Sequence, residues 1–328
     1  MLIFISNFFI FFCNKKIIKK YNLKEKEVRV INNVRDILNL FPTNIKSQLE
    51  KNYQLDNLQE IRFKIGKPII LNFSNKEVIL DAKTSVDDIR ITINKISKFS
   101  IFAFEEDVKQ GFITIQGGHR VGITGEWVFE NGEIKYLKNI SSLNIRICRE
   151  VIGFGKKFIN HIYNNGYIAN TLIISPPKCG KTTLLRDLSR IISNGELPLN
   201  RGFKVSIIDE RSEIAASFQG VPQLDVGIRT DVYDNCLKSK GIILAIRSMA
   251  PEVIICDEIG TREDFESILT AYNSGVSIIS TIHGSSEEDF YNKLRINNFN
   301  TNMEKIFKCI LVLNNRNGIG SLERVRKI

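Results

Sequence analysis

One stretch of this sequence, residues 171–192, constrains the possible fold more than any other. It reads TLIISPPKCGKTTLLRDLSRII. Thr171–Ser175 is a short run of β-branched and apolar residues, which is typical of a buried strand. Leucines and isoleucines then recur at helical spacing until Gly195. The sequence therefore predicts a strand, a tight loop and a helix in direct succession.

The loop between this strand and this helix resembles the phosphate-binding pattern Gly-x-x-x-x-Gly-Lys-Ser/Thr. In such a loop, backbone N–H groups and the helix N-terminus bind the phosphates of a nucleotide. Lys181 adds a positive charge at the outer phosphates, and the Thr182 hydroxyl is suited to bind Mg²⁺. Ser175 stands in place of the first glycine, so we expect an altered entry to the loop and not a lost site. The predicted ATP-binding residues are Ser175, Pro176, Pro177, Lys178, Cys179, Gly180, Lys181, Thr182 and Thr183.

A later apolar strand ends in two acidic residues. Residues 253–258 read VIICDE and close on Asp257 and Glu258. Asp257 can bind Mg²⁺ together with Thr182, and Glu258 can polarise a water for attack on the γ-phosphate. A chance match to the loop pattern is the alternative. The acidic strand, about 75 residues after the loop, argues against it.

Two further strands are predicted to end at the same edge of the sheet. Residues 203–209 (FKVSIID) end at Asp209 and lead into Glu210, and residues 276–283 (VSIISTIH) end at His283. Carboxylates at the C-terminal edge of a parallel sheet face the nucleotide. A lone histidine is usually structural, but its place at the end of the strand after the acidic one favours a sensor of the γ-phosphate.

The arrangement of elements predicts an α/β fold, a RecA-like P-loop NTPase, preceded by a smaller α+β domain. Strands alternating with helices in the second half indicate a parallel sheet covered on both faces. The first half predicts an amphipathic helix over residues 29–41, a second helix to about residue 49, a hairpin over residues 58–73, and a helix from Ser85 to about residue 99 with a capping box.

A second hairpin is predicted over residues 111–129 (GFITIQGGHRVGITGEWVF). Its turn, Gly117-Gly118, is followed directly by His119 and Arg120. This turn either contacts a neighbouring subunit or the nucleotide, or its glycines merely satisfy positive φ angles.

The domain boundary is predicted just after one further strand, over residues 140–151. The glycine-rich residues 153–155 are the expected hinge. The predicted domains are residues 1–28, an N-terminal extension; residues 29–152, the α+β domain; and residues 153–328, the P-loop ATPase domain.

The N-terminal extension combines apolar and basic residues. Residues 1–13 (MLIFISNFFIFFC) are almost wholly apolar, and four lysines lie among the next seven residues. A membrane span needs about 20 apolar residues, and a signal peptide has its basic residues before the apolar part. The segment is therefore either a membrane-surface anchor, with aromatic side chains in the interface and lysines on anionic lipid, or an unstructured extension.

Charge and cysteine content restrict the partners and the compartment. The net charge is +10, but residues 1–30 carry seven Lys or Arg against two Glu, which is +5 of it. The rest of the chain is only mildly basic, which weakens a general argument for nucleic-acid binding. The six cysteines show no C-x-x-C spacing and no nearby histidine pairs, so reduced thiols in a cytoplasm fit better than a metal site or a disulfide framework.

Several motifs together resemble a known family. They are PPKCGKTTLLRD, DERSEI, PQLDVGIRTDV, IRSMAPEVIICDEIG and STIHGS in the second half, with GHRVGITG and ISSLNIRI in the first. They are similar to the stage III sporulation protein AA family of endospore-forming bacteria, over about residues 29–328. Because the front-half motifs belong to that family and not to phosphate-loop proteins generally, the resemblance favours a family-specific role for the Gly117-Gly118 turn.

The resemblance implies a function. That family is similar to the hexameric ATPases of type II and type IV secretion, so the chain is expected to be an ATP-hydrolysing motor of a secretion-like channel complex required for endospore formation. The implied cofactors are ATP and Mg²⁺. The implied assembly is a homo-oligomer, a hexamer, with membrane proteins of the channel complex as partners. The implied location is cytoplasmic and peripheral on the membrane, at the mother-cell face of the outer forespore membrane.

The resemblance also implies site residues. Residues 209–213 correspond to the acidic box of the secretion ATPases and His283 to their histidine box. The arginines near their active site are matched by Arg247 and Arg229. An alternative for Arg247 is a structural ion pair with Glu252 or with the acidic strand. The predicted catalytic residues are Glu258, Asp209, Glu210, His283, Arg247 and Arg229.

Two other functions fit parts of the sequence. A nucleic-acid-binding RecA-like ATPase would use the same sheet, but no basic stripe interleaved with aromatic residues is found, so nucleic acid is not an expected partner. A nucleotide-dependent scaffold would bind ATP with little turnover.

Overall fold

The computed structural model describes residues 19–21, 28–31, 34–52, 55–97, 111–299 and 303–327. The predicted membrane-surface anchor lies almost entirely outside these ranges. In the part of the chain that is described, no helix is long and apolar enough to cross a membrane.

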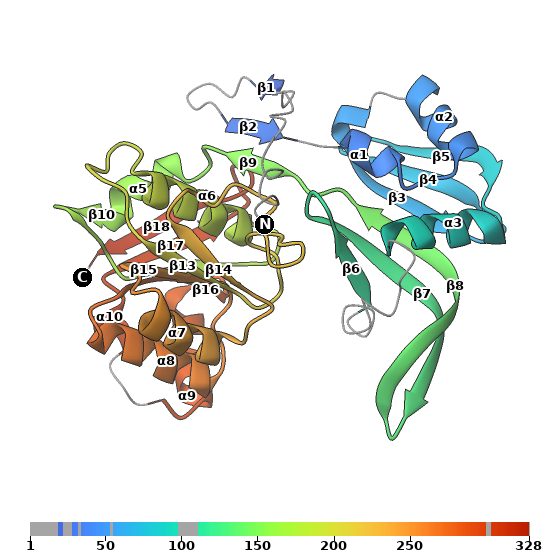
Figure 1. The fold of residues 1–328 in the computed structure, drawn as a ribbon. Coiled ribbons are helices and arrows are strands. Elements are labelled where there is room, and N and C mark those ends of the chain that lie inside the picture. The colour runs from blue at the N-terminus through green and yellow to red at the C-terminus, as the bar shows by residue number, and fades with distance from the viewer. Residues whose placement is uncertain are drawn as a thin grey trace, which may run out of the picture.

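The second half of the chain builds a mainly parallel sheet, drawn at the left of Figure 1. Within the described residues it has seven strands, in the order β14 (Thr230–Asp234), β13 (Val205–Asp209), β15 (Val253–Cys256), β16 (Ser277–His283), β12 (Thr171–Ser175), β17 (Cys309–Asn314) and β18 (Ser321–Lys327). Neighbouring strands are parallel except β17 and β18. The C-terminal ends of β12, β13, β15 and β16 therefore meet at one edge.

Helices cover both faces of this sheet, as the alternation of strands and helices predicts (Figure 1). One face carries α5 (Lys156–Ile162) and α6 (Lys181–Asn194), and the other carries α7 (Lys238–Ser248), α8 (Arg262–Asn273), α9 (Glu287–Ile296) and α10 (Met303–Ile306). The central strands supply both hydrophobic clusters, because Ile173 points to the α5–α6 side and Leu172 and Ile174 to the other. A short hairpin, β10 (Tyr163–Asn164) and β11 (Tyr167–Ile168), links α5 to the sheet.

Helix α6 is anchored firmly in the α5–α6 cluster. Leu184, Leu185 and Leu188 are completely buried. Each contributes roughly 1.5–3 kcal/mol relative to exposure. The helix ends where Gly195 adopts a φ of 72°. A rigid helix therefore begins directly at the phosphate-binding pattern.

The first half of the chain builds a separate antiparallel sheet with its own hydrophobic cluster, drawn at the right of Figure 1. In the described part it has six strands, in the order β5 (Glu77–Lys83), β4 (Pro68–Phe73), β3 (Leu58–Lys64), β8 (Glu133–Arg146), β7 (His119–Glu130) and β6 (Phe112–Ile115). Helices α1 (Val34–Leu38), α2 (Thr43–Asn52) and α3 (Val86–Ile96) pack on it, and a 3₁₀ turn, η1 (Leu55–Asn57), precedes β3. The division into domains at residues 152 and 153 stays a prediction.

Local signals in the first half are confirmed in detail. The two predicted hairpins are β3–β4 and β6–β7. Ser85 caps α3, its side chain accepting the N–H of Asp88 while the Asp88 carboxylate accepts the N–H of Ser85. These elements depend on contacts within a few residues, which a sequence pattern can report.

Two predictions for the first half are wrong. The helix expected over residues 29–41 is present only as α1, because residues before it form β2 (Val28–Ile31), which pairs with β1 (Lys19–Tyr21) and β9 (Glu150–Ile152). The single strand expected over residues 140–151 is two strands in two sheets, β8 and β9. In both cases pairing with distant residues overrides the local pattern.

Candidate active site

The phosphate loop joins β12 to α6, as predicted. Gly180 precedes the helix with a φ of 81°, a conformation that favours glycine. Ser175 ends β12 without a positive φ, so a serine replaces the first glycine at no steric cost. The Lys181 ammonium donates to the carbonyl oxygens of Ser175 and Pro176, each at 3.1 Å. The loop is therefore wrapped around the lysine that the pattern requires.

The predicted pair of Mg²⁺ ligands lies together. The Thr182 hydroxyl donates to Asp257 Oδ2 at 2.8 Å, although the two residues are 75 positions apart. The other oxygen of Asp257 accepts the Thr281 hydroxyl and, at 2.9 Å, the N–H of Glu258. Four groups from α6, from β16 and from the end of β15 are thereby joined in one network.

These residues fit a magnesium ion bound with its nucleotide. Hydroxyl and carboxylate oxygens are the hard ligands that Mg²⁺ takes, and it usually binds one or two protein groups plus phosphate oxygens and water. Among the described residues, no group of three or more His, Cys, Asp or Glu side chains is placed to hold a metal ion. Thr182 and Asp257 therefore have the chemistry of a partial site that substrate phosphates would complete, and their role as Mg²⁺ ligands stays a prediction.

Glu258 is held in an unusual backbone conformation at the end of this network. Its φ is 40°, in the left-handed region that glutamate rarely adopts, and such strain persists where the surroundings impose it. Its N–H donates to the Thr281 hydroxyl at 2.8 Å as well as to Asp257. These bonds aim the carboxylate into the cavity beside the phosphate loop.

The acidic turn after β13 is organised by Asp209. This buried carboxylate accepts the backbone N–H groups of Glu213, Ile214 and Ala215 at 2.8, 2.9 and 2.9 Å. Burial raises the pKa of Asp209, and the three N–H bonds oppose that rise. Asp209 therefore shapes the turn that carries Glu210, while its catalytic assignment stays a prediction.

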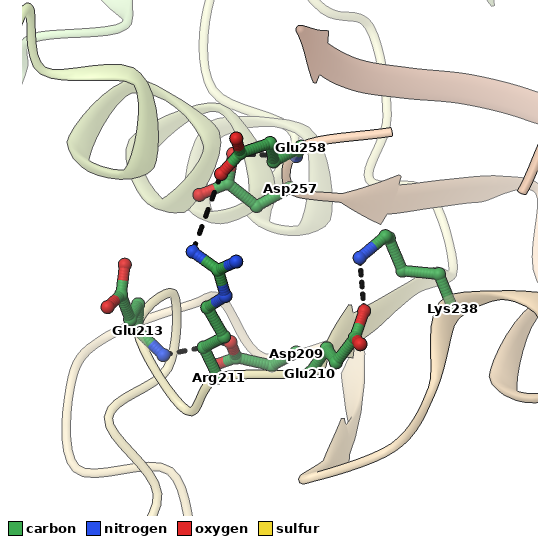
Figure 2. A pocket seen from close by; sticks show the side chains of 7 residues that line it. All are labelled: Asp209, Glu210, Arg211, Glu213, Lys238, Asp257 and Glu258. Atoms are coloured by element: carbon green, nitrogen blue, oxygen red, sulfur yellow. Dashed lines mark hydrogen bonds and ion pairs between the residues drawn. The ribbon is translucent and has the colours of Figure 1, made fainter. Parts of the chain in front are cut away.

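A small cavity lies between this turn and the end of β15 (Figure 2). Glu210 faces Lys238, the first residue of α7, in an ion pair. Arg211 crosses the cavity to Glu258, with its Nη1 3.5 Å from Oε2 of the glutamate. The cavity is lined by Asp209, Glu210, Arg211, Glu213, Lys238, Asp257 and Glu258.

Two cationic residues of this cavity were not predicted individually. Arg211 lies inside the DERSEI motif, which was a signal that could have identified it. Lys238 follows no motif, and it reaches the cavity because α7 begins at the same sheet edge.

A buried arginine, also missed by the sequence analysis, connects the phosphate-loop helix to the acidic turn. Arg186, on α6, donates to the carbonyl oxygens of Glu213, at 2.7 Å, and Ile214. Burial lowers the pKa of Arg186. Arg186 belongs to the KTTLLRD part of the family motif, which could have marked it as a candidate. The motif gives no sign of which residues it contacts.

The predicted histidine lies beside the phosphate loop. His283 is the last residue of β16 and is exposed. It stands opposite Ser175 in the parallel register of β12 and β16. Its role as a phosphate sensor stays a prediction.

The two predicted arginines lie away from the cavity of their own subunit. Arg229 donates to the carbonyl of Ser193 at 2.9 Å, near the end of α6 opposite the loop. Arg247 is exposed in the last turn of α7, nine residues and about 14 Å along the helix axis from its first residue at the cavity. The catalytic role of both arginines stays a prediction.

The ion-pair alternative for Arg247 is wrong in the described part of the chain. Glu252 instead pairs with Arg201, at 2.6 Å. Asp257 is occupied by its two threonine partners and the following N–H group.

The Gly117-Gly118 turn is a contact between the two halves of the subunit. The N–H of Gly117 donates to Gln223 Oε1 at 2.8 Å. Arg120 pairs with Glu213 at 3.0 Å and donates to the carbonyl of Arg211. The β6–β7 hairpin of the first half thus contacts the second half through hydrogen bonds and an ion pair, two of them at the acidic turn.

Comparisons of the sequence with known proteins give a family match and a similar relative. The family described as "Sporulation stage III, protein AA" matches residues 31–327. Stage III sporulation protein AA of Bacillus subtilis (strain 168) is 38% identical to this chain over 297 residues, which is 89% of this chain and 94% of that protein.

Solved structures show the same fold. The pilus retraction motor PilT with bound ADP matches with a TM-score of 0.57 and 14% identity, over 87% of this chain and 81% of that chain. The ATPase DotB of Legionella pneumophila matches with a TM-score of 0.55 and 16% identity, over 83% and 77%. The predicted RecA-like P-loop fold is confirmed.

Proposed function

Because the chain belongs to the sporulation stage III protein AA family, we propose that it is an ATPase that drives a secretion-like channel complex in endospore formation. The observation that carries this proposal is the network from Thr182 through Asp257 to Glu258, which joins the phosphate loop to a strained glutamate. It contains the groups that nucleotide hydrolysis needs, at one edge of one sheet.

We propose that ATP binds with its phosphates on the N–H groups of the loop and the N-terminus of α6. Lys181 then exchanges its two carbonyl partners for outer phosphate oxygens. Thr182 and Asp257 would hold Mg²⁺, which would supply positive charge to neutralise the phosphates. Glu258 takes a proton from the water that attacks the γ-phosphorus, while the bond from that phosphorus to the departing ADP oxygen breaks.

The contact between the two halves supports a motor role. Glu213 lines the cavity between the acidic turn and the end of β15, and it also pairs with Arg120 of the first half. A movement of the acidic turn on hydrolysis would therefore be transmitted to the first half through the ion pair between Glu213 and Arg120. We propose that a homo-oligomer, a hexamer, uses this path to act on membrane proteins of the channel complex, as a cytoplasmic protein bound peripherally to the membrane.

Two substitutions test the site. Lys181→Ala should abolish ATP binding or turnover, because it removes the ammonium that the loop offers to the outer phosphates. Glu258→Gln should bind ATP with near-normal affinity and hydrolyse it at least about a hundredfold more slowly. Binding is measured with a fluorescent ATP analogue and turnover by phosphate release.

Matched controls are Lys305→Ala and Glu266→Gln, which change an exposed lysine and an exposed glutamate on α10 and α8. Both should hydrolyse ATP like the unsubstituted protein. Near-normal hydrolysis in Lys181→Ala would contradict the site, and lost binding in Glu258→Gln would make Glu258 structural. Strong stimulation by single-stranded DNA at two salt concentrations would favour a nucleic-acid ATPase, and binding without any turnover a scaffold.

A further inference from the structure

The cavity beside the phosphate loop has an excess of negative charge. Among its lining residues are five carboxylates and two cations, Arg211 and Lys238. A nucleoside triphosphate bound beside this cavity would add further negative charge. Like charges a few ångströms apart repel strongly in a partly buried site. Besides Lys181 of the loop, the two cations of this cavity are therefore candidates to offset the charge of a γ-phosphate beside Glu258.

The two cations are held very differently. The Lys238 side chain is only 12% exposed and is committed to Glu210 by an ion pair. The Arg211 side chain is 72% exposed, and its one ion pair among the described residues, to Glu258, is 3.5 Å long. An exposed pair of this kind contributes little to stability. Of the two, Arg211 is the cation that can change partner at little cost.

The backbone of Arg211 is fixed while its guanidinium is not. Its carbonyl accepts a hydrogen bond from Arg120, and the next residue, Ser212, donates through its hydroxyl to Asp234. Arg211 also lines a second cavity of about 310 Å³ on the side of β6, which gives the side chain room to move. Figure 2 shows the side chain rising from the acidic turn towards Glu258. Arg211 therefore carries an exposed charge on an anchored backbone.

We propose that Arg211 is a catalytic residue supplied from within its own subunit. It pairs with Glu258 before ATP binds, and it moves to the γ-phosphate when ATP is present. Guanidinium forms stronger, bidentate hydrogen bonds with phosphate oxygens than it makes here with the carboxylate. This inference rests on the proposed ATPase function and adds a residue to it.

The exchange of partners has a chemical consequence. While Arg211 is on Glu258, the carboxylate is engaged by a cation and is a poorer base for water. Departure of Arg211 frees Glu258 to accept a proton, and the guanidinium then stabilises charge on the γ-phosphate oxygens as the water attacks. ADP lacks the γ-phosphate and leaves Arg211 where it is. Glu258 is therefore free to act as a base only when ATP is bound.

The test uses the full-length protein with Arg211→Ala, which removes the guanidinium and keeps the carbonyl that Arg120 contacts. We expect kcat to fall at least about tenfold, and affinity for a non-hydrolysable ATP analogue to fall about tenfold. Affinity for ADP should be unchanged. Arg295→Ala, which removes an arginine 69% exposed and paired with Glu288 on α9, is the matched control and should change none of these values.

A second variant separates a phosphate contact from an effect through the glutamate. In a Glu258→Gln background, Arg211→Ala should still weaken the ATP analogue by the same factor, since the proposed bond is to phosphate. Unchanged or raised kcat in Arg211→Ala, or equal losses for ADP and the analogue, would overturn the proposal. If the unsubstituted protein fails to hydrolyse ATP, the proposed function itself fails; if it hydrolyses ATP and only Arg211→Ala is unaffected, the function stands without this residue.

Discussion

At the scale of single residues, burial changes the chemistry of His119. This side chain is 1% exposed, its Nδ1 accepts the N–H of Cys148 at 3.0 Å, and its Nε2 has no hydrogen-bond partner in the described part of the protein. Burial lowers the pKa of His119 to about 4. The ring is therefore neutral in the folded protein at neutral pH, with its proton on Nε2.

The lowered pKa predicts a loss of stability in mild acid. Between pH 6.5 and 4 the unfolded chain binds a proton at this histidine that the folded chain does not, so the free energy of unfolding decreases as pH falls. From pH 7.5 to pH 5, His119 should account for about 2 kcal/mol of this decrease. Urea unfolding of the protein and of His119→Asn, which keeps an acceptor for Cys148 and does not titrate, measures the difference. Equal pH dependence in the two proteins would show that His119 is not the cause.

At the scale of elements, the β6–β7 hairpin is set against the acidic turn by its glycines. Gly118 has a φ of 76°, and a Cβ on it would lie 2.7 Å from the Cβ of Ala216. Gly66, in the turn of the β3–β4 hairpin, has a φ of 73°, and nothing lies within 4 Å of a Cβ added there. An alanine at either position would therefore have the same unfavourable positive φ, but only at position 118 would it also meet a neighbouring residue.

Gly118→Ala should therefore loosen the second half of the subunit more than Gly66→Ala. Each alanine costs roughly 1–2 kcal/mol for its left-handed backbone, but only Gly118→Ala also forces the hairpin away from Ala216. The amides of Gln223 and Leu224, which donate to the carbonyl of Ala215, report on this contact. Hydrogen exchange at these two amides should be faster in Gly118→Ala than in Gly66→Ala, and equal rates would mean that the contact does not order the segment.

At the scale of the whole molecule, the position of Arg247 bears on how subunits would assemble. Helix α7 starts at the cavity with Lys238 and carries Arg247 to its far end, where the side chain is exposed. If Arg247 is catalytic, this position favours the nucleotide of a neighbouring subunit over that of its own subunit. Repeated contacts of this head-to-tail kind close into a ring when the rotation allows it.

Mixing two inactive variants tests this arrangement. Arg247→Ala and Lys181→Ala should each be inactive, and a 1:1 mixture should recover activity, because up to about a quarter of the interfaces then combine an intact loop with an intact arginine. Subunit exchange is first verified by energy transfer between labelled chains. No recovery after proven exchange would assign Arg247 to its own subunit or to structure, and full activity of Arg247→Ala alone would remove it from the mechanism.

The sequence by itself determined the parts of this protein that depend on neighbouring residues. The strand, loop and helix from Thr171 to Gly195, the two hairpins of the first half and the cap at Ser85 follow from spacing, turn chemistry and capping, which act over a few positions. The family motifs and the acidic strand ends also predicted the α/β class and the loop as a site.

Only the tertiary structure decided the pairings between distant segments. Strand β2 pairs with β9 about 120 residues away and so replaces part of a predicted helix. Arg211 meets Glu258, and Arg120 meets Glu213, across 47 and 93 positions. No periodicity encodes such contacts, because each depends on how segments far apart in the chain are brought together by the fold. The cavity, the pairing of Arg211 with Glu258 and the contact with the first half are therefore visible only in the tertiary structure.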